Sequence, residues 1–156
     1  MTQVVPFFIL LIAFSAFAKS VNDFEGIYIN RHSIYLASEN RTVHNVEDIV
    51  RIQPVDTQKA NILIETYTQN YHSCQLIGEA TLKGDALVFT STVDKRLNRG
   101  KRTTCTLLIS QTQNEAGDKT LKVEDQSDNC KLRYCGMTAE LGGEFKQKSV
   151  LVQDKN

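Results

Sequence analysis

The sequence predicts an all-β protein, an antiparallel meander that closes into a small barrel of about eight strands and is braced by two disulfides. Three observations predict it. Apolar and polar residues alternate in short runs, which is typical of half-buried strands. No apolar stripe at helical spacing is long enough to bury a helical face, and Pro54 is the single proline after an apolar N-terminal segment. That segment is followed by four cysteines, an even number. A two-sheet β-sandwich is the alternative, because periodicity does not separate the two architectures.

The N-terminal segment has the features of a signal peptide. The first 18 residues carry no charge, and 14 of them are apolar or aromatic. The run ends in Ala16-Phe17-Ala18, the small-x-small pattern that signal peptidases cleave. It is too short to span about 30 Å of hydrocarbon as a helix. We predict a signal peptide at 1–18, one β-barrel-like domain at 19–156, no membrane anchor after cleavage, and a periplasmic or secreted location.

The first half of the domain contains three strand-like runs. Each run places alternate residues on one face. Residues 26–30 place Ile27 and Ile29 there, and residues 48–54 place Val50 and Ile52 there. Residues 61–67 do the same with Ile62, Ile64 and Thr66. Residues 38–49 are a candidate helix, but their apolar residues form no extended stripe. Strands are therefore favoured throughout this half.

The second half is a clearer meander. Residues 74–83 place Leu76, Ala80 and Leu82 on one face, with Gly78 between them. Polar turns then separate short alternating runs, which an antiparallel sheet requires. In chain order these are the turn Gly84-Asp85, the strand 87–93, the strand 105–109, the turn 114–118 and the strand 121–124.

The cysteines Cys74, Cys105, Cys130 and Cys135 are expected to form two disulfides in an oxidising compartment. A zinc site is disfavoured because the closest pair, Cys130 and Cys135, has four residues between its members rather than the two typical of zinc ligands. The meander places all four at one end of the barrel. Pairing Cys74 with Cys105 requires strong curvature, since alternate strands of a flat sheet lie roughly 10 Å apart. Pairing Cys105 with Cys130, or Cys130 with Cys135, requires less, and the connectivity stays open.

The segment 95–102 is the strongest candidate for a binding site. Five of its eight residues are basic: Lys95, Arg96, Arg99, Lys101 and Arg102. A loop of this charge on a rigid barrel is expected to dock an anionic partner; the alternative is a solvated hairpin tip. The chain has 18 basic and 18 acidic residues, and no aromatic residues flank the segment, so nucleic acid is not an expected partner.

Catalytic and metal-binding signatures have no support in the sequence. His32, His44 and His72 lie on three separate segments, and residues 124–128 lack the glycine and spacing of a calcium-binding loop. No G-x-S-x-G motif is present. We therefore expect no enzyme, no metal and no cofactor. Asn40 begins a glycosylation sequon that matters in a eukaryotic secretory pathway alone.

The cysteine-containing segments carry a resemblance. The run Asn-Cys-Lys-Leu-Arg-Tyr-Cys-Gly at 129–136, with 73–80, 105–109 and 142–145, resembles a group of small exported bacterial proteins with a four-cysteine β-rich domain. More distantly, the chain is similar to periplasmic lysozyme inhibitors of the small-barrel kind. Their Ser-Gly-x-Arg-Tyr inhibitory loop has no counterpart at 135–139, so no inhibitory residue is carried over.

The resemblance and the exported β-rich character imply a binding protein. We expect it to inhibit or neutralise a cell-wall-degrading enzyme, either as a lysozyme inhibitor or as an immunity protein against a peptidoglycan-cleaving toxin. The alternative is a lipocalin-like carrier that holds a small apolar ligand inside the barrel.

Overall fold

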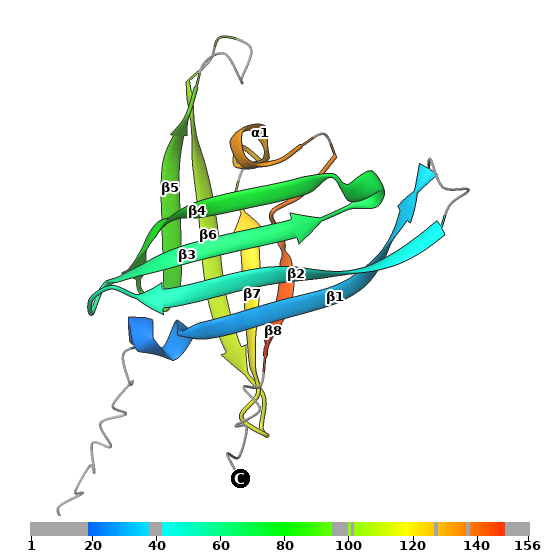
Figure 1. Ribbon diagram of the computed structural model, residues 1–156. Coiled ribbons are helices and arrows are strands. Elements are labelled where there is room, and N and C mark those ends of the chain that lie inside the picture. The colour runs from blue at the N-terminus through cyan, green and yellow to red at the C-terminus, as the bar shows by residue number, and fades with distance from the viewer. Residues whose placement is uncertain are drawn as a thin grey trace, which may run out of the picture.

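The computed structural model describes residues 19–37, 42–94, 100, 102–126, 128–136 and 138–148, and these form a closed antiparallel barrel (Figure 1). Eight strands follow one another in sequence order, and the last pairs with the first. The barrel prediction is therefore confirmed, rather than the sandwich alternative. The strands are β1 (Gly26–Leu36), β2 (Thr42–Pro54), β3 (Lys59–Tyr67), β4 (Ser73–Lys83), β5 (Ala86–Val93), β6 (Thr103–Gln113), β7 (Lys119–Asp125) and β8 (Gly143–Gln147), with short helical turns η1 (Val21–Phe24), η3 (Gln69–Tyr71) and α1 (Lys131–Tyr134).

The core follows from side-chain alternation along the strands. The described buried residues are even-numbered in β1 to β4 and, apart from Ala86, odd-numbered in β5 to β8, as with Ile62 and Ile64 on β3 and Leu107 and Ile109 on β6. All eight strands contribute to one contiguous buried cluster. The expected inward faces of 48–54, 61–67, 74–83 and 105–109 are the faces that the barrel buries.

The burial of one strand in the first half differs from the expected face. In β1 the inward residue is Tyr28, whereas Ile27 and Ile29 share the outer face and lie half-buried. Alternation alone does not identify the core face where both faces carry apolar residues. The Tyr28 hydroxyl donates to the Phe24 carbonyl and accepts from the Gln111 amide, so its polar atom is paired inside the barrel. Burial raises the pKa of this phenol.

The candidate helix at 38–49, which the sequence disfavoured, is not formed where the segment is described. Thr42 onward belongs to β2, in agreement with the preference for strands in this half.

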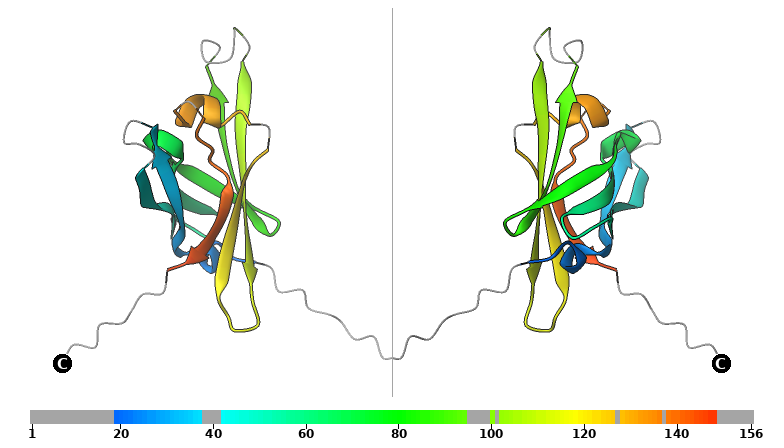
Figure 2. Two further views of the ribbon diagram at one scale, coloured as in Figure 1. Left: turned by 90° about the vertical axis from the view of Figure 1, so that its right-hand side faces the viewer. Right: turned by 90° about the vertical axis from the view of Figure 1, so that its left-hand side faces the viewer.

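The topology sorts the connections into two poles. In an antiparallel meander the links β1–β2, β3–β4, β5–β6 and β7–β8 all meet at one end, which we call the α1 pole. The links β2–β3, β4–β5 and β6–β7, together with η1, lie at the other end, the turn pole. Both views in Figure 2 show α1 beside the hairpin of β5 and β6, which extends past it. The two poles differ in almost every respect that bears on function.

The barrel wall is incomplete toward the α1 pole. β4 and β5 share three residue pairs, from Thr81↔Val88 to Lys83↔Ala86, and then diverge. The Phe89 ring fills the start of this gap, and it lies so close to Gly78 that a Cβ there would overlap it. Glycine at position 78 is therefore required by the close approach of an aromatic ring.

Candidate functional site

The helical turn α1 is fastened at both of its ends by a disulfide. Cys130, which caps its N-terminus, bonds to Cys105 of β6, and Cys135, which caps its C-terminus, bonds to Cys74 of β4. The prediction of two disulfides at one end of the barrel is confirmed, and the open connectivity is resolved. Neither bond requires the strong curvature that a bridge from Cys74 to Cys105 would need, because α1 spans the distance between the two strands.

The turn also closes the gap that β4 and β5 leave. Cys135 forms an isolated bridge with Cys74 on the free edge of β4, and the Gly136 N–H donates to the Ser73 carbonyl at 2.9 Å. On the other side of the gap, the Tyr134 hydroxyl donates to Ser91 Oγ of β5 at 3.0 Å. Its ring also meets the Phe89 ring edge-on, with centroids 6.0 Å apart. α1 thus replaces missing strand pairing with covalent and polar contacts.

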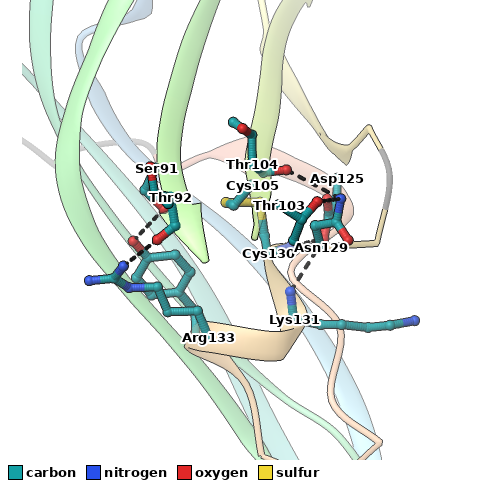
Figure 3. The surroundings of a disulfide bond; sticks show 11 residues. Ser91, Thr92, Thr103, Thr104, Cys105, Asp125, Asn129, Cys130, Lys131 and Arg133 are labelled. Atoms are coloured by element: carbon teal, nitrogen blue, oxygen red, sulfur yellow. Dashed lines mark hydrogen bonds between the residues drawn. A yellow bond between two sulfur atoms is a disulfide. The ribbon is translucent and has the colours of Figure 1, made fainter. Parts of the chain in front are cut away.

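Polar contacts fix the N-terminal side of α1 as well (Figure 3). Asp125 Oδ2 accepts from the backbone N–H groups of Cys130 and Lys131, at 2.9 and 3.3 Å. The Asn129 amide donates to Thr103 Oγ1 at 2.9 Å, and Arg133 Nη1 donates to the carbonyl of Thr92 at 2.6 Å. Asp125, which belongs to the oxygen-rich segment 124–128 noted in the sequence, therefore caps the N-terminal end of α1.

The chain after α1 crosses the end of the barrel. Ala139 and Leu141 are buried in the core, and Thr66 of β3 donates its hydroxyl hydrogen to the Glu140 carbonyl at 2.6 Å. We call residues 128–142, without the undescribed Met137, the cap. Since it contacts β3, β4, β5 and β6, it is a surface built across the α1 pole rather than a mobile connection.

The predicted basic site falls mostly on residues that the structure does not describe. Lys95, Arg96, Arg99 and Lys101 lie outside the described residues, and Arg102 is described and exposed. The last pair of the β5–β6 hairpin is Val93↔Thr103, so the connection that carries these cations begins and ends at the α1 pole.

The described residues that lie outside the strands carry different charge at the two poles. At the turn pole (19–25, 55–58, 84–85, 114–118 and 148) they include two basic and six acidic residues. At the α1 pole the described connecting residues include three of each sign. The turn pole therefore carries an excess of negative charge that the described part of the α1 pole lacks.

A feature that the sequence did not reveal is a two-stranded ribbon at the α1 pole, made of residues 30–36 and 42–48. There β1 pairs with β2 beyond the last pairs that β1 makes with β8 and β2 makes with β3. The turn η3 packs against β1, and Ile34 of the ribbon is buried. Its Gln69 and Asn70 side chains accept from the backbone N–H groups of Tyr35 and Ala37. They thereby cover part of a strand edge that would otherwise be open.

The three histidines do not come together. His32 Nε2 lies 3.0 Å from Asp48 Oδ2, the His44 ring meets the Tyr71 ring, and His72 belongs to the β3–β4 connection. Asp48 is buried and also accepts from the Tyr67 N–H, so its contacts join the base of the ribbon to β3. Among the described residues, no group of three or more His, Cys, Asp or Glu side chains is arranged to hold a metal ion.

The grooves found in the described part of the chain lie on the outer surface or between loops, and the core cluster occupies the interior. One groove, of about 360 Å³, runs beside α1 between Lys131, Leu132 and Glu140. No helix within the described residues has the length and apolar character needed to cross a membrane. Both disulfides are typical of proteins from oxidising compartments.

Comparisons with protein-family models, curated proteins and solved structures found no match. The similarity to lysozyme inhibitors therefore stays a prediction.

Proposed function

We propose that the protein is an exported, periplasmic or secreted binding protein that uses the α1 pole to neutralise a cell-wall-degrading enzyme. The observation that carries the proposal is the construction of this pole. Two disulfides and a buried crossing segment hold a non-strand surface in place at one end of the barrel. Preorganised surfaces bind with a smaller entropic cost, so rigidity of this kind serves binding.

Charge supports a partner with an acidic cleft. Glycoside hydrolases that cut cell-wall polysaccharide generally work with a pair of carboxylates beside the scissile bond. The basic connection 94–102, on a hairpin that extends past α1, is complementary to such a cleft. A predicted signal peptide and two disulfides are in keeping with the compartment where such enzymes act.

The packing of the interior favours this proposal over the lipocalin-like carrier. A carrier needs free volume inside the barrel. Among the described residues, inward side chains of all eight strands belong to one buried cluster that includes the rings of Phe24, Tyr28 and Phe145.

Inhibition assays with paired charge reversals test the proposal. The mature protein is titrated against a panel of purified peptidoglycan hydrolases, including lysozymes and bacterial muramidases, and lysis of cell walls is followed by turbidity. We expect inhibition of at least one enzyme, and an inhibition constant at least tenfold weaker for Arg99→Glu/Arg102→Glu. The matched control is Arg51→Glu/Lys83→Glu, which makes the same change of net charge at exposed residues away from this pole.

Two outcomes of these assays would contradict the proposal. If no enzyme in the panel is inhibited, the neutralising function is wrong. If inhibition occurs and both double variants weaken it equally, the α1 pole is not the binding face.

A further inference from the structure

The ribbon tip at the α1 pole presents apolar side chains that the fold does not bury. Six large apolar side chains in the described part of the chain are exposed, and four of them lie at this pole: Tyr35, Val43, Tyr71 and Leu132. Tyr35 and Val43 are direct cross-strand partners, 51% and 53% exposed, and Tyr71 is 47% exposed. Exposed tyrosines are typical of residues that anchor protein interfaces.

The backbone at Tyr71 is the second observation. Asn70 and Tyr71 both have left-handed conformations, with φ of 58° and 56°. Asparagine tolerates this conformation, and its side chain here accepts from the Ala37 N–H. A tyrosine is disfavoured there because its Cβ crowds the backbone. A five-residue link closed by a bond from the Thr68 N–H to the His72 carbonyl would be easier to form with glycine at position 71.

The fold covers Tyr71 only in part. The residue is 47% exposed, and its ring lies against the His44 ring, with 5.8 Å between centroids and a tilt of 59°. About half of the residue's surface therefore stays available beside the ribbon, although its backbone conformation is unfavourable. Unfavourable backbone geometry is typical of functional positions.

We propose that Tyr71, with Tyr35 and Val43 beside it, is an apolar anchor for the protein partner bound by the α1 pole. This inference rests on the proposed function and names a second contact area for it. The connection 94–102 begins and ends at the same pole as the ribbon, and we expect one partner to contact both. The partner surface that fits them carries carboxylates next to an apolar pocket large enough for a tyrosine ring.

The ribbon tip has a groove that extends this contact area. Tyr35, Ala37, Gln69 and Asn70 line about 300 Å³ of open space. The carbonyl oxygens of Gln69 and Asn70 accept from the ribbon backbone and hold these two walls of the groove in place. The area thus combines aromatic surface with a fixed polar wall, as interface anchors do.

Three substitutions at one position and one elsewhere test the inference. Tyr71→Gly removes the ring and relieves the backbone, Tyr71→Asn keeps a side chain suited to the conformation, and Tyr71→Phe keeps the ring. Ile77→Ser is the matched control, because Ile77 is 68% exposed on the outer face of β4, away from the pole. Each variant is measured for its melting temperature and for its Kd with the hydrolase that the wild type inhibits most strongly.

We expect Tyr71→Gly and Tyr71→Asn to melt at the wild-type temperature or up to roughly 5 °C above it. Their affinity for the hydrolase should fall at least tenfold, whereas Tyr71→Phe and Ile77→Ser should stay within threefold. If Tyr71→Gly lowers the melting temperature by several degrees, the ring is structural and the inference is wrong.

The outcome also separates the two proposals. If the wild type binds a hydrolase and Tyr71→Gly binds it equally well, the anchor is wrong while the proposed function stands. If the wild type binds none of the panel, the neutralising function and the anchor that depends on it are both wrong.

Discussion

The two poles of the barrel differ in how their strand connections are held in place. At the turn pole, strands are joined by short turns that local hydrogen bonds close: Asp56 Oδ1 accepts from two backbone N–H groups at the β2–β3 turn, and Asn114 and Asp118 bond to each other in the β6–β7 turn. At the α1 pole the connections are longer, and the described ones are held by disulfides and by contacts to distant strands.

The difference shows which end of the barrel carries structure beyond what barrel closure requires. Short turns are sufficient to close a meander, as the turn pole demonstrates. At the α1 pole, 17 residues connect β7 to β8, and two disulfides fix this connection to other strands. The same pole contains a tyrosine with an unfavourable backbone conformation. Barrel closure requires none of these features. Loops placed by a rigid scaffold are where binding residues are usually found.

Removing either disulfide is expected to have the largest effect on stability. With sequence separations of 61 and 25 residues, loss of Cys74–Cys135 should cost about 4 kcal/mol and loss of Cys105–Cys130 about 3.5 kcal/mol. Chemical denaturation of the two double-alanine variants measures these values.

Hydrogen exchange on the same variants checks where the effect falls. Without the Cys74–Cys135 bond, amides of 130–136 should exchange faster, while those at the β6–β7 turn keep their protection. Equal acceleration at both poles would show that the cap is not an independent unit of structure.

Filling the close contact at Gly78 should have the next largest effect. Gly78→Ala forces the Phe89 ring to move, and that ring supports Tyr134 of α1. We expect a loss of about 1–3 kcal/mol in the free energy of unfolding, as for other overpacked sites. The double variant Gly78→Ala/Phe89→Leu should recover part of the loss; an equal or larger loss would mean that the ring contact is not the cause.

A substitution at the turn pole gives a smaller, purely local effect. Gly117 has a φ of 89°, and a Cβ there would meet just the Gln113 amide nitrogen at 3.5 Å. Gly117→Ala should therefore cost about 1 kcal/mol through backbone strain rather than through a clash. Hydrolase inhibition should be unchanged, and a weakened inhibition constant would contradict the assignment of binding to the α1 pole.

The strands and the disulfides could be predicted because each depends on local sequence. Alternation around Ile62 and Leu107 marks one face, and an even number of cysteines after a signal peptide indicates bridges. The inward turn of Tyr28 could not be predicted, since Ile27 and Ile29 give the opposite face more apolar character. Which face is buried depends on contacts with residues far along the chain, such as Gln111.

The candidate site was predictable in part for the same reason. A run of basic residues is visible in any sequence, so 95–102 was found. The ribbon and the cap were not, because they arise from strands that stop pairing before they end, and register of this kind is a tertiary property. The conformation of Tyr71 has no sequence signature either: an Asn-Tyr pair in a link normally predicts a left-handed asparagine alone.

The smallest effect is expected from the ion pairs at the base of the ribbon. Glu47 accepts from Arg31 and Lys148, and these hydrogen bonds hold the pKa of its carboxyl below the usual range. Because the folded pKa is lowered, the stabilising contribution is present above the pKa of the unfolded chain and is lost as the pH falls through the folded value. Arg31→Met should raise the pKa of Glu47 toward its ordinary value, as measured by NMR titration of the side-chain carboxyl. The pair is solvent-exposed, so the melting temperature at neutral pH should hardly change. A large drop would mean that this exposed pair fixes the ribbon, in place of the contacts of η3 and Asp48 to which we attribute its position.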